Sequence, residues 1–185
     1  MQRTSFAEWP CSVARVLEIV GDPWTPLVLR DCYHGLSRFD DFQRSLGIAR
    51  NTLADRLRRL VDGGMLRTAA YQDNPPRHEY VLTEMGVDFF PVMSAMLSWG
   101  DRWLDGGAGP PVTITHGACG HDGQVEVVCG RCKAPLEMAD STFSLGPGYP
   151  DTLPVGVPDL RRQIRARWPV DSRCRARPEP DRDSA

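Results

Sequence analysis

The chain has no long apolar run. None of its 185 residues belongs to a stretch approaching the roughly 20 consecutive apolar residues that cross a bilayer as a helix. Residues 1–10 are polar and include Glu8, so we expect no signal peptide. There are also no internal repeats, so the chain is not a repeat array. These absences favour a cytoplasmic protein without a membrane segment.

A cytosolic location also excludes one use of cysteine. Thiols stay reduced in the cytosol, so the six cysteines are not expected to form disulfides. Clustered cysteines in such a chain are interpreted first as metal ligands. Three of the six lie together with two of the four histidines between His116 and Cys132.

The length and composition allow one ordinary domain and a small appendage. The hydrophobic fraction of 41% suffices for a packed core, and the net charge of −2 says little by itself. The charge is unevenly distributed, however. Residues 44–59 contain five arginines and one acidic residue, and residues 161–177 contain seven arginines and one acidic residue. Such local surpluses of positive charge favour a partner that carries phosphates.

Residues 11–105 have the pattern of a helical unit. Apolar residues at helical spacing predict a first helix that ends at Gly21, and a second that Asp22 can cap and Gly35 can end. A third short helix ends at Gly47, with three apolar residues turned inward: Phe39, Phe42 and Leu46.

The fourth helix, over residues 49–62, follows after a short turn. Its leucines recur at helical spacing and form one buried face: Leu53, Leu57 and Leu60. Two short helices joined by a turn with glycine, the second of them basic, indicate a helix-turn-helix. Residues 65–82 then change to extended runs around a proline-rich turn at 72–76, which predicts a hairpin, or wing. Helical spacing resumes after Thr83, its expected cap, and Pro91 is expected to bend or divide this last helix.

The exposed face of the fourth helix carries side chains suited to the major groove of DNA. Arg can hold guanine O6 and N7, and Asn can hold adenine N6 and N7. Because the first turn of a recognition helix usually reads bases, we expect base contacts from Arg50, Asn51 and Thr52. The other candidate DNA contacts are arginines on this helix, before it and at the wing tip: Arg38, Arg56, Arg58, Arg59 and Arg77. The alternative is a solvated basic helix in a protein-binding module.

Three segments, residues 8–32, 37–66 and 75–86, together resemble the HxlR group of bacterial transcriptional regulators, winged-helix relatives of the MarR group. The resemblance runs from about Ser5 to Trp103. It implies a homodimer that binds a short palindromic operator on double-stranded DNA, with repression as the expected mode. It also implies a dimer interface formed by the first helix and the helix after the wing.

The apolar stripe of that last helix suits such an interface. It contains more apolar surface than one small domain needs to bury: Phe89, Met93, Met96, Trp99 and Trp103. A stripe of this kind can equally belong to a core.

Cys11 is a candidate sensor of an oxidant or a small-molecule effector. Some members of the group that the chain resembles sense electrophiles or oxidants through a cysteine ahead of the first helix. Here Pro10 precedes this cysteine, whereas those members have a proline after it. A thiol at a helix N-terminus has its thiolate stabilised by the backbone dipole, which lowers its pKa. The alternative is a small residue packed at the dimer seam. Cys32, inside an apolar helix, is expected to be inert.

The cluster of cysteines and histidines divides into two pairs, each with a gap of two residues: His116 with Cys119, and Cys129 with Cys132. Each gap turns both donors toward one ion, and four donors form the closed tetrahedral set of a structural Zn²⁺ site. Extended runs at 111–115 and 124–128 favour a small β zinc ribbon over residues 112–140. Such a unit is too small to fold on apolar burial alone, so the metal would stabilise it.

Two alternatives remain for this cluster. His121 could replace His116 as the fourth ligand. The cluster could also hold the catalytic zinc of an enzyme, but such a zinc needs an open coordination position. Neither Asp122 nor Glu126 belongs to a recognisable general-base motif, so we do not expect an enzyme. Some regulators of the HxlR group carry a similar C-terminal extension, which this one resembles.

We therefore expect a mainly α (α+β) fold in three parts. Residues 5–107 form a winged helix-turn-helix domain with a long dimerisation helix, residues 112–140 a zinc ribbon, and residues 141–185 a largely disordered tail rich in Pro and Arg. Within the tail, three apolar residues share one stripe of a short docking helix: Leu160, Ile164 and Trp168. The ribbon and tail could also form an arm that contacts protein or DNA.

Overall fold

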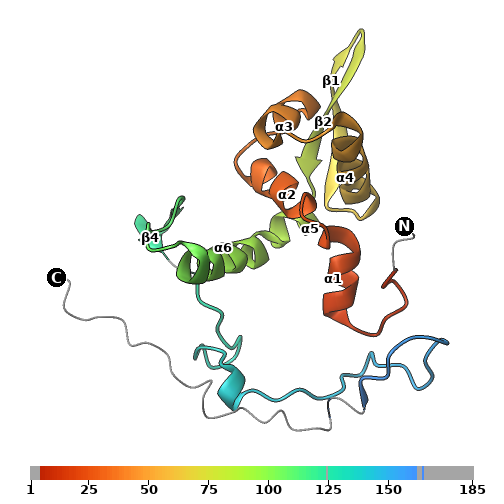
Figure 1. Ribbon diagram of the computed structural model, residues 1–185, viewed down its shortest axis with the longest axis vertical. Helices are drawn as coiled ribbons and strands as arrows, with labels where there is room; N and C mark the ends of the chain where they lie inside the picture. The colour runs from red at the N-terminus through yellow and green to blue at the C-terminus, as the bar shows by residue number, and fades with distance from the viewer. Residues whose placement is uncertain (1–4, 124, 162–163, 165–185) are drawn as a thin grey trace. The chain divides into compact units, whose positions relative to one another are not determined.

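In the computed structural model, which describes residues 5–123, 125–161 and 164, four helices open the chain. They are α1 (Ser12–Val20), α2 (Thr25–Tyr33), α3 (Phe39–Leu46) and α4 (Arg50–Asp62). The turn between α3 and α4 begins at Gly47, whose φ of 60° lies in the left-handed region that glycine tolerates. This is the predicted helix-turn-helix, and Figure 1 shows it beside the hairpin that follows.

The core lies among α2, α3, α4 and the start of the hairpin. The three leucines that were predicted to face inward from α4 are completely buried, and so is Phe42 of α3. Phe39 and Leu46 pack against this cluster, as predicted, together with Val28 and Leu29 of α2. Burial of each large apolar side chain contributes about 1.5–3 kcal/mol. The cluster therefore fixes the orientation of α4 on the domain.

The N-terminus of α2 is capped by Asp22, as predicted. Its Oδ1 accepts hydrogen bonds from the backbone N–H groups of Trp24 at 2.9 Å and Thr25 at 3.1 Å. Its Oδ2 accepts a hydrogen bond from the Thr25 hydroxyl. At the other end of the helix, the N–H of Gly35 donates to the carbonyl of Cys32, and the φ of Gly35 is 89°.

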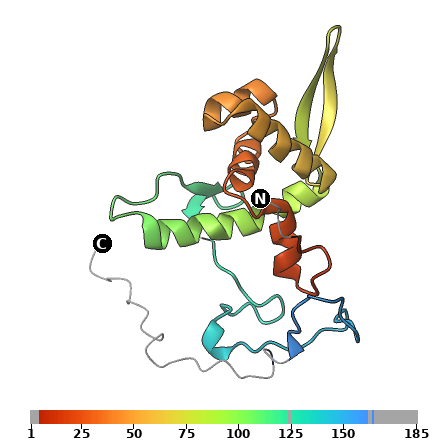
Figure 2. The ribbon, with the colours of Figure 1, turned by 45° about the vertical axis from the view of Figure 1, so that its right-hand side comes forward.

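The wing consists of β1 (Leu66–Asp73) and β2 (Pro76–Leu82), which pair in antiparallel register from Leu66 opposite Leu82 to Asp73 opposite Pro76. The strands reach further into the turn than predicted, because Asp73 and Pro76 pair directly. Tyr80 donates its backbone N–H to the carbonyl of Ser37 at 2.7 Å, which ties the wing to the α2–α3 loop. Figure 2 shows the hairpin standing out from the helices.

The helix after the wing is divided, as expected from Pro91, into α5 (Glu84–Asp88) and α6 (Phe90–Leu104). Pro91 lies in the first turn of α6, where it needs no intrahelical N–H donor. The hydroxyl oxygen of Thr83 caps α5 by accepting a hydrogen bond from the N–H of Gly86 at 3.1 Å.

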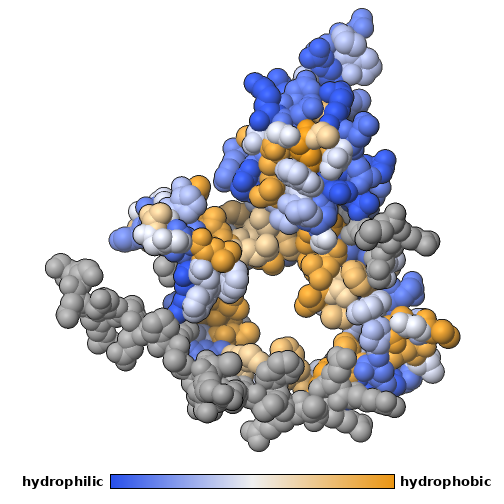
Figure 3. Space-filling view, viewed as in Figure 1, coloured by the Kyte–Doolittle hydropathy of each residue, from blue (hydrophilic) through white to orange (hydrophobic). Residues whose placement is uncertain are grey.

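The apolar stripe predicted for the helix after the wing separates into two parts. Phe89 packs against the core, whereas Met96, Trp99 and Trp103 are exposed. Helix α1 shows the same behaviour, since its apolar face remains largely exposed: Val13, Val16 and Leu17. Figure 3 shows the resulting hydrophobic surface along these two helices. Among the described residues, no helix has the length and apolar character that a membrane span requires.

After α6, a small hairpin pairs β3 (Ile114–His116) with β4 (His121–Gly123). The first strand overlaps the extended run predicted at 111–115, but the second lies before the run predicted at 124–128. The reason is the tight turn after His116, which brings His121 directly opposite it. Within 124–128, Val128 forms an isolated bridge with Pro135.

Contacts divide the chain into two units, Met1–Glu126 and Val127–Ala185. The second unit contains a short 3₁₀ helix, η1 (Met138–Asp140), and a hydrogen bond from the Tyr149 hydroxyl to Asp159 at 2.8 Å. Of the stripe predicted in the tail, Ile164 donates its N–H to the carbonyl of Leu160 at 2.9 Å. Trp168 and about half of the segment predicted to be disordered, 141–185, lie outside the described residues.

Candidate nucleic-acid interface

The face of α4 opposite its buried leucines carries the predicted base-reading residues. Asn51 is exposed, the side chain of Arg50 is 70% exposed, and Thr52 is half-buried at the edge of this face. The buried leucines prevent the helix from turning, because rotation would bring them into water. The first turn of α4 therefore presents its polar side chains outward.

Two arginines at this surface, Arg50 and Arg38, stack on aromatic rings. The guanidinium of Arg50 lies 4.7 Å from the ring centroid of Phe39 on α3. That of Arg38, just before α3, lies 4.5 Å from the ring of Tyr71 on the wing. Such cation–π contacts hold the side chains in place while leaving their N–H donors available. Arg38 thereby joins the helix-turn-helix to the wing.

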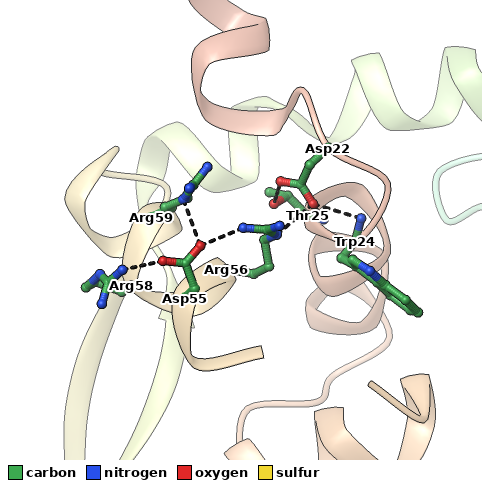
Figure 4. A network of polar contacts seen from close by, with 7 residues as sticks. All are labelled: Asp22, Trp24, Thr25, Asp55, Arg56, Arg58 and Arg59. Carbon is green, nitrogen blue, oxygen red and sulfur yellow. Dashed lines mark hydrogen bonds and ion pairs between the residues drawn. The ribbon is translucent and has the colours of Figure 1, made fainter. Parts of the chain in front are cut away.

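The other three arginines of α4 surround one carboxylate, that of Asp55 (Figure 4). Its Oδ2 lies 2.6 Å from Nη1 of Arg56 and 3.0 Å from Nε of Arg59. Its Oδ1 accepts a hydrogen bond from Arg58. The three arginines and Asp55 all lie on the middle and last turns of α4.

Arg56 is placed differently from its neighbours. Its side chain is only 19% exposed, and its Nε also lies 2.9 Å from Oδ1 of Asp22, the residue that caps α2. This contact is an ion pair without the alignment of a hydrogen bond. Arg56, proposed from the sequence as a DNA contact, thus bridges α4 and the N-terminus of α2.

The wing contributes further cations. Arg77, predicted at the wing tip, is exposed. In the strand register it lies opposite Gln72, next to the terminal pair of Asp73 and Pro76. Arg67, which is exposed on β1, was not among the residues predicted from the sequence to contact DNA. It follows the buried Leu66, and alternation along a strand turns neighbouring side chains to opposite faces. That alternation is the signal that could have identified it.

The predicted zinc ligands lie in two local pairs. In the first unit, Nδ1 of His116 lies 3.4 Å from Sγ of Cys119. In the second, the backbone N–H groups of Cys132 and Arg131 donate to Cys129 and lower the pKa of its thiol. Among the described residues, no three Cys, His, Asp or Glu side chains gather closely enough to hold a metal. The four-ligand site stays a prediction, and so does the choice between His116 and His121.

The two cysteines of the winged domain differ in their surroundings. Cys11 occupies the N-cap position of α1 and is partly exposed. Cys32 is buried in α2, and this burial raises the pKa of its thiol to about 12. Cys32 therefore stays protonated at neutral pH, in agreement with its predicted inertness.

Two adjoining helices on one core, an exposed polar face on the second and a following hairpin define a winged helix-turn-helix protein. Residues 19–107 match the model of the HxlR-like helix-turn-helix family. The chain belongs to this family, as the sequence resemblance predicted.

Relatives and solved structures agree with this membership. An HTH-type transcriptional regulator of Mycobacterium tuberculosis, Rv3095, is 41% identical over 138 residues, which cover 75% of this chain and 87% of the relative. The crystal structure of PA1607, described as a transcription factor, is 35% identical and has a TM-score of 0.69. It covers 76% of this chain and 99% of its own. PA1374 of Pseudomonas aeruginosa has a TM-score of 0.55 at 35% identity, covering 76% of this chain and 96% of its own.

These matches are longer than the winged domain. A similarity over 138 residues cannot fit within residues 1–107, so it includes part of the segment after residue 107, the C-terminal extension. The family model alone ends at residue 107. The extension is therefore shared with some relatives rather than peculiar to this chain.

Proposed function

We propose that the protein is a sequence-specific transcriptional regulator that binds a palindromic operator as a homodimer and represses transcription. Helix α4 would enter the major groove, with base contacts from Arg50, Asn51 and Thr52. Arg38, Arg58, Arg59 and Arg77 would contact phosphates. The observation that carries the proposal is the exposed polar face of α4, held outward by three completely buried leucines.

A second copy of the chain is the proposed partner of the apolar faces of α1 and α6. Trp99 is 60% exposed and Trp103 58% exposed, which is unusual for such large apolar side chains. On α1, Val13 is 68% exposed. A dimer that covered these residues would place two copies of α4 on one face of the DNA, as a palindrome requires.

The test is selection of bound duplexes from random DNA with the full chain. We expect an enriched site of two inverted halves about 10 base pairs apart. Sedimentation should give two chains per duplex, and affinity should fall steeply with salt because arginines displace counterions from phosphates. Transcription from a promoter that contains the site should decrease when the protein is added. No enrichment, or affinity that is independent of salt, would contradict the proposal.

A structural Zn²⁺ in the extension is a second part of the proposal. His116, Cys119, Cys129 and Cys132 would hold it, and the ion would supply a crosslink between the two pairs. Two observations support the fit of these residues to zinc: the 3.4 Å approach of His116 to Cys119 and the stabilised Cys129 thiolate. An enzyme built on the same cluster is not favoured, because the relatives are described as transcriptional regulators.

A further inference from the structure

Asp55 lies where an acidic residue should weaken DNA binding. It follows Asn51 by four residues, so both share the face of α4 that points away from the buried leucines. A carboxylate on that face repels phosphates. Yet Asp55 is only 28% exposed, because three guanidinium groups surround it. Its role is therefore connected with these arginines.

The three arginines differ in how far they reach solvent. The side chain of Arg58 is 68% exposed and that of Arg59 33% exposed, and each has Asp55 as its carboxylate partner. Arg56 is 19% exposed and is also paired with Asp22, which is itself 13% exposed. Arg56 thus has a second carboxylate partner, which is largely buried and lies outside α4. Arg58 and Arg59 are the two that a phosphate can reach.

Carboxylate and phosphate oxygens compete for the same guanidinium donors. A phosphate that approaches Arg58 or Arg59 must first displace Asp55, so part of the gain from the new contact is lost with the old one. On DNA of arbitrary sequence, this exchange reduces the net stabilisation. On an operator, base contacts from the first turn of α4 hold the helix in one orientation in the groove, in which Arg58 and Arg59 face phosphates and Asp55 does not, so the carboxylate weakens binding less.

We propose that Asp55 is a specificity-determining residue, an inference that rests on the proposed function. It acts as an internal counter-ion that occupies Arg58 and Arg59 until operator phosphates replace it. Asp22 and Arg56 support this arrangement by fixing the adjoining part of α4 to the N-terminus of α2. The consequence is selective weakening of binding to DNA that lacks the operator.

The experiment compares Asp55→Asn with the parent on random duplex and on the selected operator, over a range of salt. The substitution keeps the shape of the side chain and removes its charge. We expect affinity for random duplex to rise about 3–10-fold, with a smaller rise on the operator, so the ratio of the two affinities falls. The slope of log affinity against log salt should steepen by about 1–2 for each recognition helix, since two arginines are freed for phosphates.

Asp62→Asn is the matched control, because Asp62 is exposed on the same face of α4 one heptad later and belongs to none of the ion pairs of the described residues. It should change random-duplex affinity less than about 2-fold. Asp55→Glu should restore the parental affinities and slopes. Circular dichroism of each variant checks that the fold is intact.

Two results would overturn the inference. The first is Asp55→Asn behaving as Asp62→Asn does on random duplex. The second is Asp55→Asn losing affinity for both duplexes, which would make Asp55 a residue that orients the arginines onto phosphates. A parent that binds neither duplex in a salt-dependent way would instead contradict the proposed function, so the two failures are distinguishable.

Discussion

Asn51 stands exposed in the first turn of α4, where recognition helices read bases. Asn51→Ala should reduce discrimination at one base position of each half-site by about 1–3 kcal/mol, and leave affinity for random DNA unchanged. Arg77→Ala at the wing tip should weaken binding to all sequences and reduce the salt slope by about 1. Competition binding against single-base operator variants measures the first effect, and affinity measured over a range of salt concentrations measures the second. If Asn51→Ala discriminates between bases as the parent does, α4 is not the recognition helix.

Cys11 and Cys32 are two thiols of one domain that should differ in their reactivity toward oxidants and electrophiles. Cys11 is partly exposed at the N-cap of α1, whereas burial raises the pKa of Cys32 to about 12. Diamide or an aldehyde should therefore release operator DNA from the parent and from Cys32→Ser, but not from Cys11→Ser. Gel shifts before and after treatment measure the release. Equal release from all three proteins would remove Cys11 as a sensor.

Single positions also show how far sequence reasoning reaches. Helical spacing predicted the buried leucines of α4 and the exposure of Asn51, because burial in a helix follows its period. The same spacing could not assign Arg56. Its partner Asp22 lies in the turn before α2, and only the packing of α2 against α4 brings the two charges together. Pairs between elements are set by tertiary structure, which a helical wheel does not contain.

At the scale of elements, α5 is held against the base of the wing at Gly86. A Cβ at this position would lie 2.2 Å from the carbonyl oxygen of Met65 and 3.0 Å from a methyl group of Leu82. The carbonyl oxygen of Gly86 accepts a hydrogen bond from the Tyr33 hydroxyl at 2.7 Å. Gly86→Ala should therefore lower the free energy of unfolding by about 2 kcal/mol or more, since backbone must move.

Tyr33→Phe separates this close approach from the hydrogen bond. It removes only the hydroxyl that donates to Gly86 and should cost about 1 kcal/mol. Urea unfolding of both variants gives the comparison. A Gly86→Ala variant as stable as the parent would show that α5 can move away from the hairpin without loss.

The elements of the winged domain were predicted better than those of the extension. Caps such as Asp22 and Thr83, and the interruption at Pro91, are local signals that mark helix ends from the sequence. The second strand of the small hairpin was misplaced, since the β-branched run at 124–128 has high strand propensity. The turn after His116 selects His121–Gly123 as its partner instead. Strand pairing depends on the turn as well as on propensity.

At the scale of the whole molecule, the exposed apolar faces of α1 and α6 predict a dimer. Trp99→Glu places a charge in the middle of the proposed interface and should give a folded monomer with weakened operator binding. Ala70→Glu adds the same charge on the exposed surface of the wing and should leave the protein dimeric. Sedimentation equilibrium measures the mass of each. A dimeric Trp99→Glu protein would place the interface elsewhere.

The extension gives a second prediction at this scale, because four proposed ligands come from two units of the chain. One Zn²⁺ per chain is expected by elemental analysis, and Cys129→Ser should lose it. His116→Ala should also lose the ion and His121→Ala should keep it, if the two pairs form one tetrahedral set. The reverse result for the two histidines would assign His121 as the ligand, and a parent without zinc would remove the site.

Metal removal also separates a structural ion from one needed for DNA recognition. The winged domain has its own buried core among α2, α3 and α4, and none of the proposed ligands belongs to it. A chelator should therefore unfold the extension while operator affinity stays within about 2-fold of the parent, as it should after deletion of residues 112–185. Circular dichroism and binding measured on the same samples give both readouts. If chelation leaves the extension folded, the ion does not hold it; if chelation and deletion both abolish operator binding, the extension acts on the DNA-binding domain itself.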